Sequence, residues 1–199
     1  PFAVIGGGLA GTEAAYQIAA RGLPVQLYEM RPQRQTLAHQ TDLLGELVCS
    51  NSLKADTLTS GHGLLKAELR QLGSLILQAA DASRVPAGAA LAVDRGRFAQ
   101  YITAAIQHHP NITLIRQEVV ELPAAQITIV ATGPLTSPAL TAHMQRRLGS
   151  QHLYFYDALS PIVAAESIDQ SKTFFASRYD VGDGDDYLNC PLDRAMYEQ

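Results

Sequence analysis

The sequence predicts an α/β protein whose first domain is a doubly wound, Rossmann-like parallel sheet. Three observations support this fold class. An apolar strand at residues 2–5 runs directly into a glycine turn that contains Gly6, Gly8 and Gly11, an amphipathic helix follows, and a second apolar strand ends at Glu29. A strand, a glycine turn, a helix and an acid-terminated strand together are typical of a βαβ unit that binds a dinucleotide.

The glycines have the spacing G-x-G-x-x-G, which gives each of them a separate task. Gly6 makes the tight turn, Gly8 lets the backbone approach a pyrophosphate, and Gly11 lets the helix pack closely. The helix N-terminus then presents backbone N–H groups to the phosphates. The spacing from Gly11 to Glu29 is close to the ~20 residues expected for the acid that binds a ribose 2′-hydroxyl. A carboxylate there disfavours a 2′-phosphate, so we expect FAD or NAD rather than NADP.

Composition limits the class of protein. The chain has 199 residues, is 47% hydrophobic and carries a net charge of −4. It lacks an apolar run of the ~18 residues needed to span a membrane and lacks a signal-type N-terminus, so we expect a cytoplasmic protein. Cys49 and Cys190 are too far apart for a metal knuckle and too few for a disulfide framework, which predicts reduced thiols and no metal site. The acidic balance shows no basic footprint for nucleic acid.

The segment after Glu29 lacks a clean helical or strand period, and long irregular segments inside α/β domains are often functional. Arg31 could approach the cofactor phosphates or be solvated, and His39 could be a base or a turn residue. Cys49 is followed by Ser50-Asn51-Ser52. These neighbours could stabilise a reactive thiolate, although a cysteine packed as a small hydrophobic residue is the alternative.

Periodicity predicts the elements that follow. A helix from Gly63 is expected to bury a face made by the apolar residues Leu65, Leu69, Leu72 and Ile76. Asp94 is expected to cap another helix. The apolar patterns at residues 112–115 and 119–122 indicate two strands, and Val119 and Val120 in the second could lie beside the adenine of a bound dinucleotide.

A buried strand at residues 127–130 is expected to end in the Ala131-Thr132-Gly133 turn, which brings bare backbone to the carboxyl edge of the sheet. Ser137-Pro138 then begins another helix. After residue 150 the composition shifts to clustered aromatics and an acidic loop at 183–186, for which a solvated loop is favoured over a calcium site. We therefore expect a nucleotide-binding domain at residues 1–150 and the beginning of a second domain at 151–199. Both chain ends look cut, which predicts a portion of a longer protein.

The chain resembles the bacterial folate- and flavin-dependent tRNA uracil-5-methyltransferases along essentially its whole length. The general blocks are VIGGGLAGTEAA, LYEMRP and IVATGPLTSPAL; the most specific are ELVCSNS and LYFYDA. The resemblance implies a glutathione-reductase-like FAD domain and an inserted second domain that begins within this chain. It implies these FAD-binding residues: Gly6, Gly8, Gly11, Glu29, and nearby Arg31, Val120, Ala131, Thr132 and Gly133.

The resemblance also implies a reaction. A one-carbon unit from methylenetetrahydrofolate passes by way of reduced FAD to carbon 5 of a uracil in the T-loop of tRNA, with NADH or NADPH as hydride donor. Cys49 stands where this family has a cysteine, which implies a catalytic role. Attack on uracil carbon 6, protection of the flavin-bound carbon and proton transfer all stay open. The family's other important cysteine lies beyond this chain, and Cys190 does not match it.

The chain departs from the family at Gln40, where the family usually has a second histidine, and at Ala89, where it has glycine. Two other functions stay open as alternatives. One is a noncatalytic FAD-binding fragment, because the family's chain is over twice this length and part of the cofactor cleft lies beyond residue 199. The other is a flavin-dependent oxidoreductase that does not act on RNA.

Overall fold

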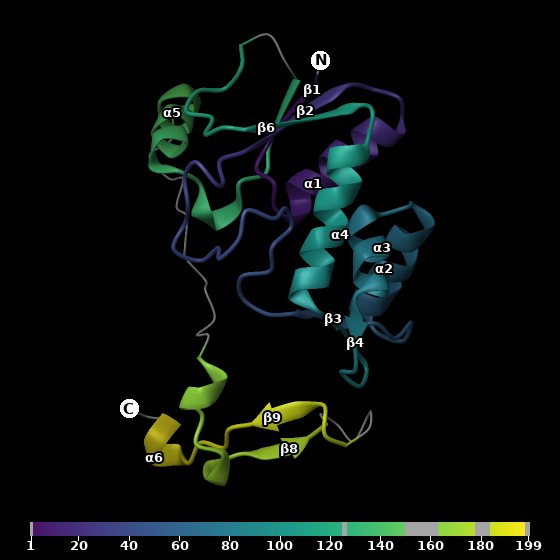
Figure 1. Ribbon diagram of the computed structural model, residues 1–199, viewed down its shortest axis with the longest axis vertical. Coiled ribbons are helices and arrows are strands. Elements are labelled where there is room, and N and C mark those ends of the chain that lie inside the picture. Colours follow the sequence, from purple (N-terminus) through teal and green to yellow (C-terminus); the bar gives the residue numbers. More distant parts are fainter. Residues whose placement is uncertain (1, 125–126, 150–162, 178–183, 198–199) are drawn as a thin grey trace.

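A parallel four-stranded sheet is the centre of the larger part of the molecule (Figure 1). The computed structural model describes residues 2–124, 127–149, 163–177 and 184–197. The strand order is β6-β2-β1-β7, with bounds β1 (Phe2–Ile5), β2 (Val25–Glu29), β6 (Ile112–Arg116) and β7 (Ile127–Val130). This order, with β1 between β2 and β7, confirms the predicted doubly wound α/β class.

The register brings the functional ends of the strands to one edge. Phe2 pairs with both Val25 and Ile127, so β2 and β7 run alongside β1 from the same level. The glycine turn, Glu29 and the turn after β7 therefore emerge together at the carboxyl edge. Ligands of doubly wound folds bind at this edge, beside the point where the strand order reverses.

Helices cover the sheet. Helix α1 (Leu9–Ala20) and α4 (Arg95–His108) lie on one side, and α5 (Pro138–Leu148) lies on the other (Figure 1). The predicted caps are present, since the Asp94 side chain accepts from Arg97 N and the Ser137 side chain accepts from Leu140 N. The core between α1, α4 and the sheet includes the fully buried side chains Val4, Leu27, Phe98, Ile102 and Ile106.

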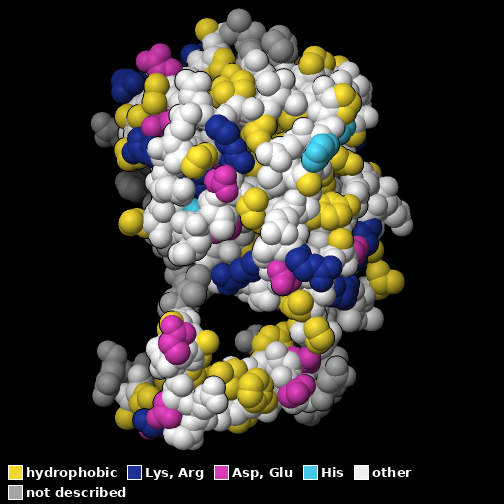
Figure 2. All heavy atoms as spheres, viewed as in Figure 1, with side chains coloured by type: hydrophobic (Ala, Val, Ile, Leu, Met, Phe, Trp, Pro, Cys, Tyr) yellow, Lys and Arg dark blue, Asp and Glu magenta, His cyan; other side chains and the backbone are white. Residues whose placement is uncertain are grey.

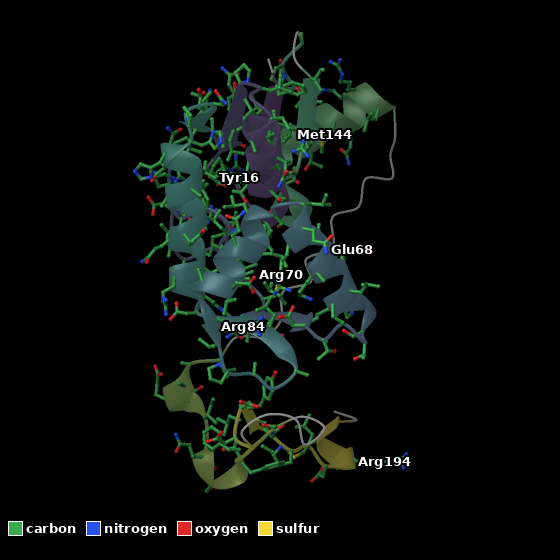
Figure 3. The ribbon with its side chains drawn as sticks, turned by 90° about the vertical axis from the view of Figure 1, so that its right-hand side faces the viewer. Tyr16, Glu68, Arg70, Arg84, Met144 and Arg194 are labelled. Carbon is green, nitrogen blue, oxygen red and sulfur yellow. The ribbon has the colours of Figure 1, made fainter. Side chains whose placement is uncertain are left out.

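A second, antiparallel sheet lies beside this core. It has the order β3-β5-β4 and the bounds β3 (Ser52–Ala55), β5 (Ala90–Val93) and β4 (Arg84–Val85). Helices α2 (Gly61–Gln71) and α3 (Leu75–Ala82) connect β3 to β4. Arg70 and Arg84 lie close together there (Figure 3), because both bind Asp56 and Arg70 also binds Asp81 at 2.8 Å.

The expected helix from Gly63 is divided, and its apolar face is buried only in part: Leu69 and Ile76 are half-buried, and Ile76 packs against the core. Gly73, at φ 73°, stops α2, and Ser74 caps α3. Leu65 and Leu72 are 54% and 68% exposed. The face that α2 turns inward instead carries Gly63 and Lys66, because the Lys66 amine donates to the Ala55 carbonyl of β3.

Two strand expectations are also wrong. Residues 119–122 form no strand, because Gln117 N turns back to donate to Ile115 O and ends β6 there. Strand β7 forms as predicted but is not buried, since Ile127 is 66% exposed. Within the described residues β7 pairs only with β1, so it is an edge strand whose outer side is uncovered.

A smaller part follows, seen below the main body in Figure 2, and the Tyr187 hydroxyl in it donates to Ala87 O of the main body at 3.3 Å. Its elements are η2 (Ala165–Ser167), η3 (Gln170–Lys172), β8 (Phe174–Ala176), β9 (Tyr187–Asn189) and α6 (Arg194–Tyr197). The predicted boundary near residue 150, the 153–157 aromatics and Asp183 lie outside the described residues, so the boundary stays a prediction. No helix in the described ranges is long and apolar enough to cross a membrane.

Candidate dinucleotide-binding site

A cavity of about 310 Å³ opens at the carboxyl edge of β1, β2 and β7. Most of the predicted cofactor residues line it: Gly6, Gly8, Glu29, Arg31, Ala131, Thr132 and Gly133. Gly11 lies behind the lining, and Val119 lines the cavity whereas Val120 is 48% exposed and outside the lining. The cavity is therefore formed by segments that are far apart in the sequence and meet at one sheet edge.

Two of the three motif glycines are required by close backbone contacts. Gly6 has φ 107°, and a Cβ there would lie 2.6 Å from the Ala131 carbonyl oxygen. A Cβ on Gly11 would lie 1.8 Å from the Gly6 carbonyl oxygen. Gly6 thus lets the glycine turn lie against the turn after β7, and Gly11 lets α1 begin directly beneath the glycine turn.

Gly8 differs from them, because no contact among the described residues requires the absence of a side chain there. Its backbone (φ −77°, ψ −168°) suits any residue, and a Cβ there would meet no atom within 4 Å. The space lies beside the first turn of α1, whose N–H groups suit a phosphate. The residues present therefore fit a dinucleotide diphosphate, whose close approach at Gly8 the G-x-G-x-x-G spacing predicts.

The Glu29 carboxylate joins the glycine turn to the segment after β2. Its oxygens accept from Gly7 N and from Arg31 N and Nε, at 2.9 to 3.0 Å. Burial alone would raise the pKa of Glu29, but the hydrogen bonds from Arg31 and Gly7 outweigh it, so the pKa lies below the ordinary 4.5. Glu29 is thus an ionised carboxylate at the cavity wall.

Arg31 is almost fully buried, at 1% exposure, and acts as a bridge. Besides Glu29, its guanidinium donates to Glu46 Oε2 at 2.9 Å and to Thr41 O at 3.1 Å. Glu46 in turn accepts from Gln40 N at 2.8 Å and from the Thr41 hydroxyl at 2.9 Å. The irregular segment around residues 39–41 is therefore held against the end of β2 by a buried ion-pair chain.

His39 is the side chain that this segment contributes to the cavity. Its Nδ1 lies 2.7 Å from the Thr36 hydroxyl. Burial lowers the pKa of His39 below 6.5, and the Arg31 charge lowers it further against the opposing effect of Glu46 and Glu29. The imidazole is therefore neutral at physiological pH.

Charged side chains also lie beside the cavity on the segments that follow β2 and β6. Arg34 donates to both carboxylate oxygens of Glu118, at 2.7 and 2.8 Å, and Glu118 lines the cavity. Arg116 donates to the Arg31 carbonyl at 3.1 Å. The segments after β2 and β6 are thereby tied to each other beside the cavity.

Cys49 is half-buried and does not line the cavity, although its neighbour Val48 does. Asn51 is paired with Val93, through an Asn51 Nδ2 to Val93 O bond of 3.1 Å, which fixes the end of the Cys49 segment on the second sheet. Cys49 thus lies one residue from the cavity lining. Cys49 and Cys190 do not form a disulfide with each other.

Sequence reasoning missed Glu46 and Thr36 and left His39 open. The sequence offers only a weak signal for them: an acid and a threonine in a segment without periodicity, which any solvated loop shares. The role of Glu46 follows from its bond to Arg31, fifteen residues away in the sequence. The role of Thr36 follows from a turn that brings its hydroxyl to His39, three residues on, and no periodicity predicts that turn.

Residues 1–199 match the family described as "Glucose inhibited division protein A". The chain is 59% identical over 196 residues to the methylenetetrahydrofolate–tRNA-(uracil-5-)-methyltransferase TrmFO of Geobacter sulfurreducens and 57% identical to that of Aquifex aeolicus. These matches cover 98% of this chain and 45% and 44% of the two relatives. The resemblance seen in the sequence is thus confirmed, and the chain spans less than half the length of the curated relatives it matches.

The fold has a counterpart among solved structures. Aquifex aeolicus GidA in its form II crystal superposes with a TM-score of 0.58 at 18% identity, over 73% of this chain and 30% of that one. At this identity the likeness shows the fold, which is the α/β arrangement described above. The family match along the whole length of the chain, residues 1–199, establishes that it belongs to the glucose inhibited division protein A family.

Proposed function

We propose that the cavity holds the adenosine diphosphate part of FAD. The observation that carries this proposal is the open space at Gly8, beside the first turn of α1 and within the same cavity as the Glu29 carboxylate. A phosphate suits the first, and a ribose hydroxyl suits the second. We place three further groups around the same cofactor: Arg31, Val120 and the 131–133 turn. Arg31 acts by holding the Glu29 carboxylate in place.

The proposed activity of the whole protein is formation of 5-methyluridine in tRNA, because the relatives at 57–59% identity carry that name. Methylenetetrahydrofolate would be the one-carbon donor, NADH or NADPH the reductant, and the cytoplasm the compartment. FAD, when bound, supplies the carrier for the carbon and the electrons. The chain's own residues hold it: the glycine turn accepts the diphosphate, and the sheet edge keeps water from one side.

Cys49 is proposed as a catalytic residue of this reaction. Cys49 is half-buried and directly follows Val48, which lines the cavity. A small movement of this loop would bring the Cys49 thiol to a substrate bound at the opening of the cavity. A thiolate there has the nucleophilic character that uracil activation requires, since addition at carbon 6 makes carbon 5 nucleophilic.

The test has two stages. The purified protein is examined for a stoichiometric flavin spectrum, and then for 5-methyluridine in tRNA by nucleoside mass spectrometry, with methylenetetrahydrofolate and NADH or NADPH present. Cys49→Ala is expected to keep the flavin and abolish methylation, with Cys190→Ala as the matched control that keeps both. Flavin reduction without any tRNA product would favour an oxidoreductase, and methylation that survives Cys49→Ala would remove Cys49 from the chemistry.

A further inference from the structure

Thr36 determines where the proton of His39 is. The Thr36 hydroxyl oxygen accepts from two backbone groups, Ala38 N at 3.3 Å and His39 N at 3.2 Å. A hydroxyl has two acceptor sites and one proton. Since both acceptor sites are used, the hydroxyl proton is donated to His39 Nδ1, which lies 2.7 Å away. Nδ1 is therefore the acceptor nitrogen of the ring.

A neutral imidazole with an acceptor Nδ1 carries its proton on Nε2. The ring is neutral because burial and the Arg31 charge lower the pKa of His39, against Glu46 and Glu29. Within the described part of the chain no residue accepts a hydrogen bond from Nε2. A half-buried N–H group on a cavity wall needs an acceptor, which water or a ligand can supply.

The backbone that carries His39 is held in place from the opposite side. Glu46 accepts from Gln40 N and Thr41 N, at 2.8 and 3.2 Å, and is itself bound by the buried Arg31. Thr36 before the ring and Glu46 after it thus fix both the position and the tautomer of His39. Such a doubly fixed donor at a cavity wall is preorganised for an oxygen ligand.

We propose that His39 is a binding residue for the dinucleotide, donating its Nε2–H to an oxygen atom of the cofactor's diphosphate or of its ribose. The proposal rests on the FAD site proposed above and adds a residue and a chemical role to it. Thr36 and Glu46 are then positioning residues that act through His39.

The test compares three substitutions of one residue by titration calorimetry of flavin-free protein with FAD. Gln carries an N–H donor at about the reach of Nε2, whereas Asn places it near Nδ1 and Ala has none. We expect His39→Ala and His39→Asn to weaken FAD binding by about tenfold, as for loss of one hydrogen bond to a charged or polar acceptor, and His39→Gln to stay within about threefold of wild type. Thermal melts confirm that each variant is folded.

Nitrogen-15 NMR supplies a readout independent of binding. In the wild-type protein we expect the proton on Nε2, and in Thr36→Val we expect mixed tautomers. Titration with ADP and with adenosine locates the acceptor: a His39→Ala loss seen with ADP alone indicates the diphosphate, and an equal loss with adenosine indicates the ribose. Wild-type protein that binds no FAD would overturn the proposed function, while FAD binding unchanged in His39→Ala, or a wild-type proton on Nδ1, would overturn only the role of His39.

Discussion

At the scale of single residues, the glycine turn contains one glycine that packing requires, Gly11, and one whose role we assign to ligand binding, Gly8. Gly11 is confined by the Gly6 carbonyl, and Gly8 faces open space. We predict that Gly11→Ala destabilises the protein by about 3 kcal/mol or more, because its Cβ clashes with backbone that cannot move aside. Gly8→Ala is predicted to melt like the wild type while weakening FAD binding at least about tenfold, because the methyl group occupies the phosphate's space.

Thermal melts and FAD titrations of the two variants form one experiment, in which each variant is the control for the other. Equal stability of Gly11→Ala and wild type would contradict the packing argument. Unchanged FAD affinity in Gly8→Ala would contradict the assignment of the open space to a phosphate.

Glu29 makes the free energy of unfolding depend on pH in the acidic range. Its folded pKa lies below the ordinary 4.5, so the ionised carboxylate stabilises the fold above that value. As pH falls from 4.5 through the lower folded pKa, the carboxylate becomes protonated in the native state and this contribution is lost. We predict that Glu29→Gln costs about 3 kcal/mol near neutral pH, because it leaves Arg31 buried beside a neutral amide, and that this cost shrinks in acid.

Urea unfolding of both proteins across that pH range measures the effect. Glu68→Gln, an exposed carboxylate on α2, is the control and should change little. A Glu29→Gln deficit that stays constant with pH would show that the carboxylate's charge is not what stabilises the fold.

At the scale of elements, Glu13 on α1 binds the start of α3. Its carboxylate accepts from the Ser74 hydroxyl at 2.8 Å, from Ile76 N at 2.9 Å and from Leu75 N at 3.3 Å. These are N-terminal N–H groups of a helix, where negative charge is favourable. We predict that Glu13→Ala lowers the free energy of unfolding by about 1 to 2 kcal/mol. Chemical unfolding beside Glu68→Ala measures it, and equal losses would show that the cap contributes nothing.

The elements also show where sequence reasoning succeeds and where it stops. Local signals carry the βαβ unit, the Asp94 and Ser137 caps and the existence of β7, because cap chemistry and short apolar runs are encoded within a few residues. The burial of α2 was predicted wrongly, since its inward face is set by Lys66 reaching the Ala55 carbonyl and by Gly63 pressed against Thr57. A helix can thus turn a lysine inward when a neighbouring strand leaves a carbonyl to satisfy.

The candidate site divides in the same way. The glycines, Glu29 and the 131–133 turn were found because each follows a predicted strand, and parallel strands end at one edge. The Arg31–Glu46 pair and the Thr36–His39 contact join parts of an irregular segment whose path no periodicity predicts. Residues whose role depends on tertiary contacts of this kind become visible only in the folded chain.

At the scale of the whole molecule, the site joins segments from β1 to α5, so a ligand that fills it should stabilise the larger part of the protein as a unit. The lining runs from Ile5 to Leu140 and includes the ends of β1 and β2 and the turn after β7. A ligand that binds only the folded state adds about 2.7 kcal/mol when present at a hundred times its dissociation constant. This gain in the free energy of unfolding requires the ligand groups proposed to contact Gly8 and Glu29, which belong to the adenosine diphosphate part of FAD. FMN lacks the adenosine and its phosphate, so it should not give the same gain.

We therefore predict that FAD raises the melting temperature of the flavin-free protein by several degrees, roughly as 2.7 kcal/mol does for a domain of this size, and that FMN at equal concentration does not. Amide hydrogen exchange at the glycine turn and around residues 36–46 should become slower when FAD is added but not when FMN is added. Gly8→Ala should lose most of the shift while keeping its melting temperature without ligand. A shift of equal size with FMN would mean that the flavin end, rather than the adenosine diphosphate end, contacts the described cavity, because only that end is common to both ligands.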